Sequence, residues 1–314
     1  METRETTDLN MAEESTRQPL YGRYEALHLR KLAAILEQCP LAFVPSGTLE
    51  WHSHHLPLGL DGLLAEEVCL RAARKSGGVV VPTTYWAIGG VPYAFTMRIE
   101  PDVVEALFVS ILEQLGQVGF RAVIVFAGHY GLDHHSALKR AALKVMERAG
   151  LIVHALPEFE LLTDLGFRSG DHAGALETSL LWALRPEMIH MERLPSAGAL
   201  EGIQGEDPRQ GSSEARGQAL VEPLVERLAQ LAGRLLRASH EERSAHQATL
   251  AAQIAYLNDI QRERATKPLA LAHPLLSETY LRALDALWRG QYPTAIETLE
   301  TARLEVLTNK GSMI

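Results

Sequence analysis

Carboxylate and imidazole side chains are concentrated in one short stretch of the chain, residues 50–61. Two carboxylates and three histidines lie within it, and Glu50 and His52 share one face of an extended segment. Asp61 follows a Pro-Gly loop that can fold back to the same point. Imidazole and carboxylate together suit divalent zinc, manganese or iron. The stretch predicts a metal site, although a histidine cluster beside a strand can also be surface decoration without a ligand.

Two further groups of the same chemistry follow. His129 comes directly after an apolar run, and His172 and Glu177 lie where a helix begins. His172 is a candidate proton shuttle because imidazole titrates near neutral pH, and its alternative is a helix-entry histidine bonded to backbone. Glu177 is a candidate ligand and catalytic residue, and its alternative is a solvated or capping acid near the positive end of the helix dipole.

The candidate ligands are numerous enough for two ions. The set comprises Glu50, His52, Asp61, His129 and Glu177. Three carboxylates and two imidazoles can hold two divalent ions that share one carboxylate and a water. Such ions lower the pKa of the shared water toward neutrality and polarise a carbonyl oxygen. The predicted reaction is hydrolysis at a carbonyl carbon, with an amide as the first choice.

The elements that must position these side chains alternate along the chain. Four apolar runs are expected to be strands: residues 41–45, 79–82, 119–127 and 151–153. Helical spacing is found at residues 24–38, 63–75, 102–118 and 134–149. Continuously apolar strands alternating with helices predict a mostly parallel sheet covered on both faces. Because ligands bind outside the carboxyl ends of such strands, His52 and His129 can meet there.

The rest of the chain is expected to be largely helical. Residues 198–217 are interpreted as a long loop, and an amphipathic helix over residues 220–239 closes the main domain. We therefore expect three parts: a flexible tail (1–20), a main domain (21–239) and a helical C-terminal extension (240–314). The extension ends in a hairpin that is faintly like one tetratricopeptide-type unit. One such unit cannot bury its own face, so packing on the main domain or a sister subunit is favoured over a peptide-binding array.

Composition restricts the class of partner and the compartment. A chain of 314 residues with 46% hydrophobic content can bury a full core. A formal charge of -9 argues against nucleic acid or an anionic membrane as the main partner. No apolar stretch reaches the ~18 residues that span a bilayer, and the polar N-terminus is unlike a secretion signal. Cys39 and Cys69 lack metal-binding spacing and are interpreted as buried thiols in a reducing cytoplasm.

Three motifs resemble those of the creatininase (creatinine amidohydrolase) family. The form G-s-x-E-x-H-g-x-H-L-P-l-g-x-D stands at residues 47–61, a strand ending in G-H-Y at residues 128–130, and H-A-G-x-x-E-T-S at residues 172–179. The resemblance covers roughly residues 24–237. It implies a three-layer α/β/α fold, two divalent metal ions, and a ring-shaped homo-oligomer, commonly a hexamer.

The resemblance also implies roles for individual residues. One metal would be held by Glu50, Asp61 and His129. The other would be held by His52, Asp61 and Glu177, with His172 as the acid/base.

Several positions depart from the family pattern. Ser53 replaces the glycine of the first motif, and Gly131 stands where creatininase has a metal-binding glutamate. Leu132 replaces the asparagine of the common form, and residues 93–96 replace a P-G-T segment. The metal frame is therefore expected to be present, while the substrate pocket is not that of creatininase.

The resulting hypothesis is a metal-dependent hydrolase of a non-peptide C–N bond in a small cyclic amide or formamide. Zinc and/or manganese are the expected ions, with iron as the alternative. The aromatic residues expected to wall the pocket are Trp51, Trp86 and Tyr130. Members of the family also handle cyclic sugar-derived ketones and small peptides, which leaves the bond open. The alternative from another class is an inactive scaffold that interacts through the C-terminal helices.

Overall fold

A sheet of five parallel strands forms the centre of the molecule, in the order β1-β3-β2-β4-β5. The computed structural model describes residues 18–165, 171–266 and 277–308. The strands are β1 (Tyr21–Arg23), β2 (Leu41–Ser46), β3 (Gly78–Val80), β4 (Ala122–Ala127) and β5 (Ile152–Pro157). Every residue of β2 to β5 is buried, which explains why these strands are apolar runs without alternation.

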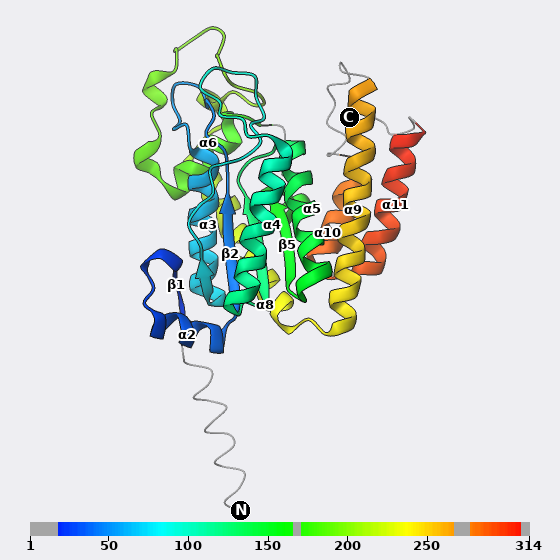
Figure 1. Ribbon diagram of the computed structural model, residues 1–314. Helices are drawn as coiled ribbons and strands as arrows, with labels where there is room; N and C mark the ends of the chain where they lie inside the picture. The colour runs from blue at the N-terminus through cyan, green and yellow to red at the C-terminus, as the bar shows by residue number, and fades with distance from the viewer. Residues whose placement is uncertain (1–17, 166–170, 267–276, 309–314) are drawn as a thin grey trace, which may run out of the picture.

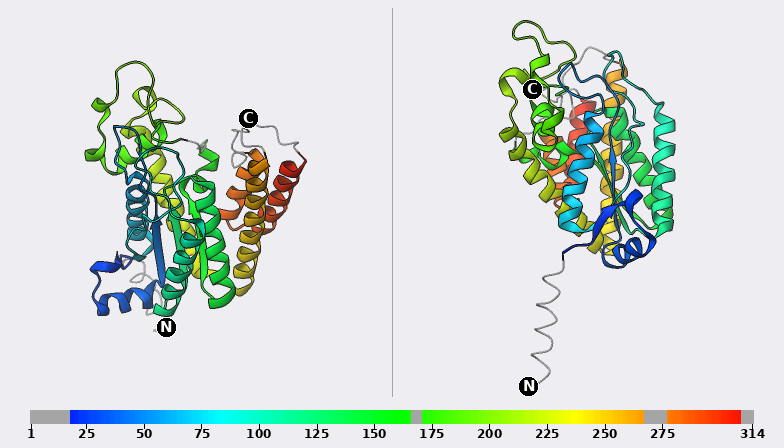
Figure 2. Two further views of the ribbon diagram at one scale, coloured as in Figure 1. Left: turned by 45° about the horizontal axis from the view of Figure 1, so that its top comes forward. Right: turned by 90° about the vertical axis from the view of Figure 1, so that its left-hand side faces the viewer.

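Helices cover both faces of the sheet, as the two orientations in Figures 1 and 2 show. On one face lie α3 (Leu60–Ser76) and α8 (Glu214–Arg237), and on the other lie α4 (Pro101–Val118) and α5 (Leu132–Ala149). At the lower end in Figure 1 lies α2 (Leu29–Gln38). The predicted three-layer α/β/α fold with a parallel sheet is confirmed.

The segments at the upper end in Figure 1 contain short elements. These include α6 (Ala175–Leu184) and α7 (Pro208–Gly211).

Short 3-10 helices occur in several parts of the described chain. They are η1 (Tyr24–Ala26), η2 (Glu158–Leu161), η3 (Thr163–Leu165), η4 (Pro186–Met188) and η5 (Met191–Arg193).

Two elements differ from the sequence prediction. The expected loop at 198–217 contains α7 and the first turn of α8, because the Ser213 hydroxyl accepts a hydrogen bond from the Arg216 amide and caps α8 early. The strand β1 was not predicted, and it pairs with β3 through its backbone. Of the predicted tail, residues 1–17 lie outside the described residues. Cys39 and Cys69 are free and buried, as expected.

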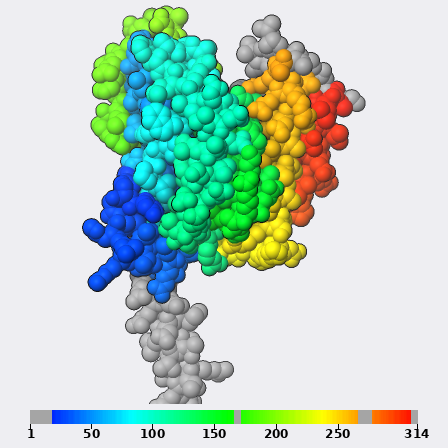
Figure 3. Space-filling view, viewed as in Figure 1, coloured from blue at the N-terminus to red at the C-terminus, as the bar shows by residue number. Residues whose placement is uncertain are grey.

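The C-terminal extension packs against the β5 edge of the sheet. It consists of α9 (His240–Thr266), α10 (Glu278–Trp288) and α11 (Tyr292–Leu307), and it forms the right-hand flank in Figure 3. The helix α9 packs on α5, and α10 packs on η2 and η3. This arrangement agrees with the packing favoured over a peptide-binding array, while the division into domains at residue 239 stays a prediction. In the described parts of the chain, no helix has the length and apolar character needed to cross a membrane.

A buried polar network joins the extension to the main sheet. The Lys139 ammonium lies 3.0 Å from the Glu160 carboxylate and donates to the Ala155 carbonyl at 2.6 Å. The Gln253 amide on α9 donates to the same carboxylate at 3.2 Å and to the Tyr280 hydroxyl at 3.0 Å. Each charge in this network therefore depends on partners from another element.

Glu160→Ala is expected to lower the free energy of unfolding by about 3–5 kcal/mol, because it leaves the Lys139 ammonium buried without its counter-ion. Urea unfolding at neutral pH, followed by circular dichroism, measures this loss. The double variant Lys139→Met/Glu160→Leu removes both charges and should lose less. If the Glu160→Ala variant is at least as stable as the double variant, Glu160 does not act as the counter-ion that the buried Lys139 ammonium requires.

Candidate metal centre

The five predicted ligands meet at the carboxyl ends of β2 and β4. Glu50 and His52 lie on the segment after β2, and Asp61 lies in the first turn of α3. His129 follows β4, and Glu177 lies in the first turn of α6. All five are buried, so the sheet, α3 and α6 together enclose a cluster of three carboxylates and two imidazoles.

Asp61 stands between two groups of side chains. Its Oδ2 lies 3.1 Å from Nδ1 of His129, which is also 3.3 Å from Oε1 of Glu50. Its Oδ1 lies 3.0 Å from Nε2 of His52, which is 3.8 Å from Oε2 of Glu177. Glu50–Asp61–His129 and His52–Asp61–Glu177 are each compact enough to hold an ion. Asp61 is the residue that the two groups share, with one oxygen toward each.

Backbone carbonyls fix the orientation of the imidazoles. Nδ1 of His52 lies 3.0 Å from the Glu50 carbonyl, and Nε2 of His129 lies 3.0 Å from the Ile88 carbonyl. A carbonyl only accepts, so the ring nitrogen facing it carries the proton. The opposite nitrogen of each ring is turned toward the carboxylates. Metal-ligating histidines characteristically use their second nitrogen in this way.

The atoms that face the centre of the cluster fit a cation. Nε2 of His52 and Oδ1 of Asp61 are fully buried, and neither has a hydrogen-bond partner of acceptable geometry among the described residues. Buried polar atoms in this state cost free energy. A divalent ion between them would satisfy both, and imidazole with carboxylate is a donor set that zinc and manganese accept. The residues therefore fit two divalent ions.

The charges of the cluster shift the pKa values of its members strongly. Burial disfavours the imidazolium of His129, but the hydrogen bonds that this ring donates to Asp61 and Glu50, together with their charges, raise its pKa to about 10. Burial, with the charges of Asp61 and Asp171, holds the pKa of Glu177 well above its usual range. Without metal, the cluster therefore carries protons on groups that would have to lose them to become ligands.

Binding of zinc to the metal-free protein is expected to release protons. At neutral pH His129 lies below its pKa of about 10 and is protonated, and Glu177 is held protonated as well, so affinity should rise with pH toward that value. Titration calorimetry in buffers of different ionisation enthalpy measures the release. His246→Gln is the control, because burial lowers the pKa of this remote histidine to about 4 and leaves it neutral. Heats that do not depend on the buffer would be the contrary result.

Two glycines allow the close approach of the site elements. A Cβ atom on Gly128 would lie 2.2 Å from the backbone oxygen of Asp61, so only glycine lets the start of α3 rest on the end of β4. A Cβ atom on Gly131 would lie 2.4 Å from Nε2 of His129. At position 131, where this chain departs from the family pattern, the His129 ring therefore occupies the space that a side chain would need.

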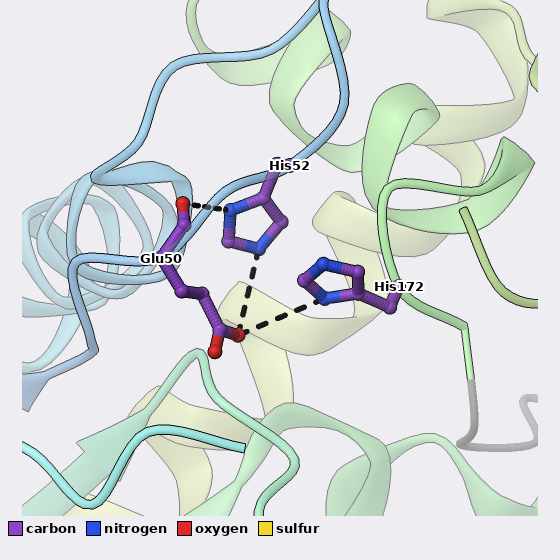
Figure 4. A group of neighbouring side chains, drawn as sticks. All are labelled: Glu50, His52 and His172. Atoms are coloured by element: carbon purple, nitrogen blue, oxygen red, sulfur yellow. Dashed lines mark hydrogen bonds and ion pairs between the residues drawn. The ribbon is translucent and has the colours of Figure 1, made fainter. Parts of the chain in front are cut away.

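His172 borders the cluster beside Glu50 and His52. Its backbone is held by paired hydrogen bonds with Gln204, at 2.9 and 2.8 Å. Its Nε2 lies 2.9 Å from the Trp51 carbonyl, and its Nδ1 faces Oε1 of Glu50 at 3.7 Å (Figure 4). Burial and the neighbouring charge of His52 lower the pKa of His172. The ring is thus anchored on one side and directed at the cluster on the other.

Two of the aromatic residues named from the sequence adjoin the site: the Trp51 carbonyl lies 2.9 Å from Nε2 of His172, and Tyr130 directly follows His129. The Trp51 ring meets Tyr93 edge-on at 5.4 Å between centroids, and the Tyr93 ring stacks 6.0 Å from His172. Trp86 is 51% exposed, and Tyr130 is half-buried beside Phe159. Tyr93 was not predicted as a site residue, although it lies in the segment before α4 that also contains Trp86 and Phe95.

Two acids near the cluster were not assigned from the sequence. Asp171 accepts a hydrogen bond from the Glu177 amide at 3.0 Å and so fixes the start of α6. Glu158 directly follows β5 and is fully buried. Its position directly after a strand could have identified Glu158 as a site residue, but the strand was predicted to end at residue 153.

The fold and the cluster define an α/β protein with a candidate two-ion centre at the carboxyl edge of a parallel sheet. The family model "Creatininase: Creatinine amidohydrolase" matches residues 25–232, and the chain belongs to this family.

Curated relatives include proteins with different printed activities. Creatinine amidohydrolase of Pseudomonas putida is 27% identical over 175 residues, covering 48% of this chain and 66% of the relative. 3-Dehydro-scyllo-inosose hydrolase of Thermotoga maritima is 26% identical over 184 residues, covering 54% and 58%. The mycofactocin precursor peptide peptidase of Mycolicibacterium smegmatis is 28% identical over 164 residues, covering 49% and 62%. The chain therefore spans two thirds or less of the length of these relatives.

A solved structure of creatinine amidohydrolase shares the fold. It superposes with a TM-score of 0.61 at 20% identity, and the match covers 71% of this chain and all of the other. The family model ends at residue 232, so the C-terminal helices α9, α10 and α11 lie outside it.

Proposed function

We propose that the chain is a metal-dependent hydrolase that cleaves an amide-type C–N bond in a small molecule. The observation that carries the proposal is the position of Asp61, whose two oxygens lie 3.0 Å from His52 and 3.1 Å from His129. This geometry suits one carboxylate shared by two ions. When bound, such ions polarise a carbonyl oxygen and lower the pKa of a water toward neutrality.

Two divalent ions are the proposed cofactors: zinc and/or manganese, with iron as the alternative. Solved creatininases are described as a manganese form and, for one glutamate-to-glutamine mutant, as a Zn–Zn form. The donor set of carboxylates and imidazoles in this chain supports the same choice of metals.

The chain's own residues have distinct proposed roles. His172 moves a proton to or from the reacting group, because its Nδ1 is directed at the cluster while its Nε2 is held by the Trp51 carbonyl. Glu177 is proposed to be a metal ligand and catalytic residue. The Ala173 amide donates a hydrogen bond to its Oε2 at 2.7 Å and so orients the carboxylate. Trp51, Trp86 and Tyr130 are proposed to wall the substrate pocket.

A cyclic amide or formamide is the proposed substrate class. Hydrolysis of a cyclic ketone or a small peptide is the alternative on the same site, because the names of two relatives describe such activities. An inactive scaffold is disfavoured, because a buried cluster of like charges costs stability that a scaffold has no reason to retain.

We further propose a cytoplasmic homo-oligomer, with a hexamer as the form that the family resemblance implies. Exposed apolar side chains near the site, including Trp86 and Phe95, are surface that a second copy could cover. The net charge of -9 supports a small-molecule substrate, with no nucleic acid and no membrane as partners.

The test is turnover by protein stripped with a chelator and reloaded with zinc or manganese. Lactams and N-formyl compounds, cyclic ketones and short peptides are offered as three separate classes. Metal-dependent hydrolysis of the first class is expected. Turnover of only cyclic ketones or only short peptides would replace the substrate proposal. Fully metal-loaded protein that hydrolyses no compound of the three classes would overturn the proposed enzymatic function.

A further inference from the structure

Glu158 occupies the same edge of the sheet as the candidate metal centre. The sheet register pairs Ala127, the last residue of β4, with Pro157, the last residue of β5. Glu158 and Gly128 therefore leave the sheet at the same edge, and Gly128 directly precedes His129. Glu158 is fully buried. A carboxylate at this depth needs hydrogen-bond donors or a cation to offset its loss of hydration.

The described residues supply Glu158 with few donors. The Tyr130 hydroxyl and the backbone amide of Glu158 favour its ionised form and act to lower its pKa. Neither carboxylate oxygen of Glu158 has a hydrogen-bond partner of acceptable geometry in the described parts of the chain. Glu160, two residues further on, is also buried but has the Lys139 ammonium at 3.0 Å. Among the residues that the structure describes, Glu158 therefore differs from its neighbour in having no lysine or arginine within ion-pair distance.

The charges around Glu158 belong to the metal cluster. Burial first, and then the negative charge of Asp61, raise the pKa of Glu158 to about 8, while His129 acts in the opposite sense. Glu158 in turn contributes to the raised pKa of Glu177. Three acids that disfavour each other's ionisation are thus gathered where a divalent ion would relieve the repulsion.

The charges of two divalent ions exceed those of the three ligand carboxylates, so a fourth carboxylate would balance the metal-loaded site. Glu50, Asp61 and Glu177 supply three negative charges against the four positive charges of two divalent ions. A fourth carboxylate would balance them before any bound anion is counted. Glu158 does not belong to either compact ligand group, so it would act on an ion through water or through its charge.

We propose that Glu158 is a further carboxylate of the metal centre that strengthens binding of one of its two ions. This inference rests on the proposed two-ion function and deepens it. Glu158 is a positioning residue, because it acts through the ion and its water. Residues that support metal ligands in this manner typically change metal affinity by about 10–100-fold.

The test compares Glu158→Gln with the unaltered protein in two measurements. Zinc affinity and stoichiometry are measured by competition with a chromophoric chelator, and the melting temperature is measured on metal-free protein. Glu158→Gln should weaken one of the two ions by about 10-fold or more. Its metal-free melting temperature should be unchanged or raised, because a buried acid among like charges is removed.

Glu160→Gln is the matched control and should behave in the opposite way. It removes a buried acid that has a cation, so it should lower the metal-free melting temperature and leave both zinc affinities unchanged. This contrast separates a role toward metal from a role in packing.

The outcomes separate this inference from the proposed function. Wild-type protein that takes up two ions, with a Glu158→Gln variant of equal affinity, overturns the inference and leaves the two-ion site standing. Wild-type protein that takes up no ion overturns the proposed function itself. Should Glu158→Gln fail to fold, Tyr130→Phe decides: selective weakening of one ion supports the inference, and unchanged affinities overturn it.

Discussion

Asp61→Ala is expected to abolish binding of both ions and to lower kcat/KM by on the order of 10³-fold or more, which is about 4 kcal/mol of transition-state stabilisation. The reason is geometric. One oxygen of Asp61 faces His129 and Glu50, and the other faces His52. Removal of this carboxylate takes a ligand from both groups at once. Elemental analysis of protein purified without chelator, together with kinetics, measures the two effects.

Asp102→Ala is the control for this experiment. Asp102 also lies in the first turn of a helix, α4, but its side chain is exposed. The variant therefore reproduces the loss of an acid at a helix N-terminus and should retain both ions and full activity. An Asp61→Ala protein that still holds two ions would contradict the shared carboxylate, because each group would then bind its ion without it.

The sequence was informative about the site wherever a strand ended in polar residues. The strands β2 and β4 are apolar apart from Ser46 at the end of β2, so the residues directly after them were expected at one edge of the sheet. The structure brings Glu50, His52 and His129 together at that edge. The partner contributed by α6 followed from a motif and not from periodicity, because its helix packs from a distant part of the chain.

Other features depend on contacts that periodicity does not record. His154 interrupts the apolar run of β5, so the strand was predicted to end before Pro157 and Glu158 was not placed at the edge. His154 is tolerated in the strand because its ring stacks 5.1 Å from His246 of α9. The strand β1 is a polar tripeptide that forms only by pairing with β3.

The backbone also explains one departure from the family pattern. Ser53 has a φ of 59°, in the left-handed region that favours glycine. The family-like glycine at this position therefore has a conformational reason, and this chain keeps the conformation with serine. Single-residue strain of this kind is visible only in the structure.

His172→Gln is expected to lower kcat by about 10²–10⁴-fold, the usual contribution of a positioned proton-transfer group. Glutamine removes the titrating ring, while Gln204 still pairs with the backbone of residue 172. The ligand groups around Asp61 do not require His172, so two ions should remain bound. The dependence of kcat on pH should lose the limb that His172 contributes. Steady-state kinetics across pH and metal analysis of the same protein measure these effects.

His54→Gln is the control, because His54 lies in the same histidine-rich stretch but its side chain is 54% exposed. It should retain wild-type kcat. The competing role for His172 is that of a ligand, since it also forms a compact group with Glu50 and His52. If His172→Gln protein loses an ion, His172 is a ligand and proton transfer must be reassigned. If it keeps both ions and wild-type kcat, the ring performs neither task, and its anchoring to the Trp51 carbonyl only shapes the wall of the site.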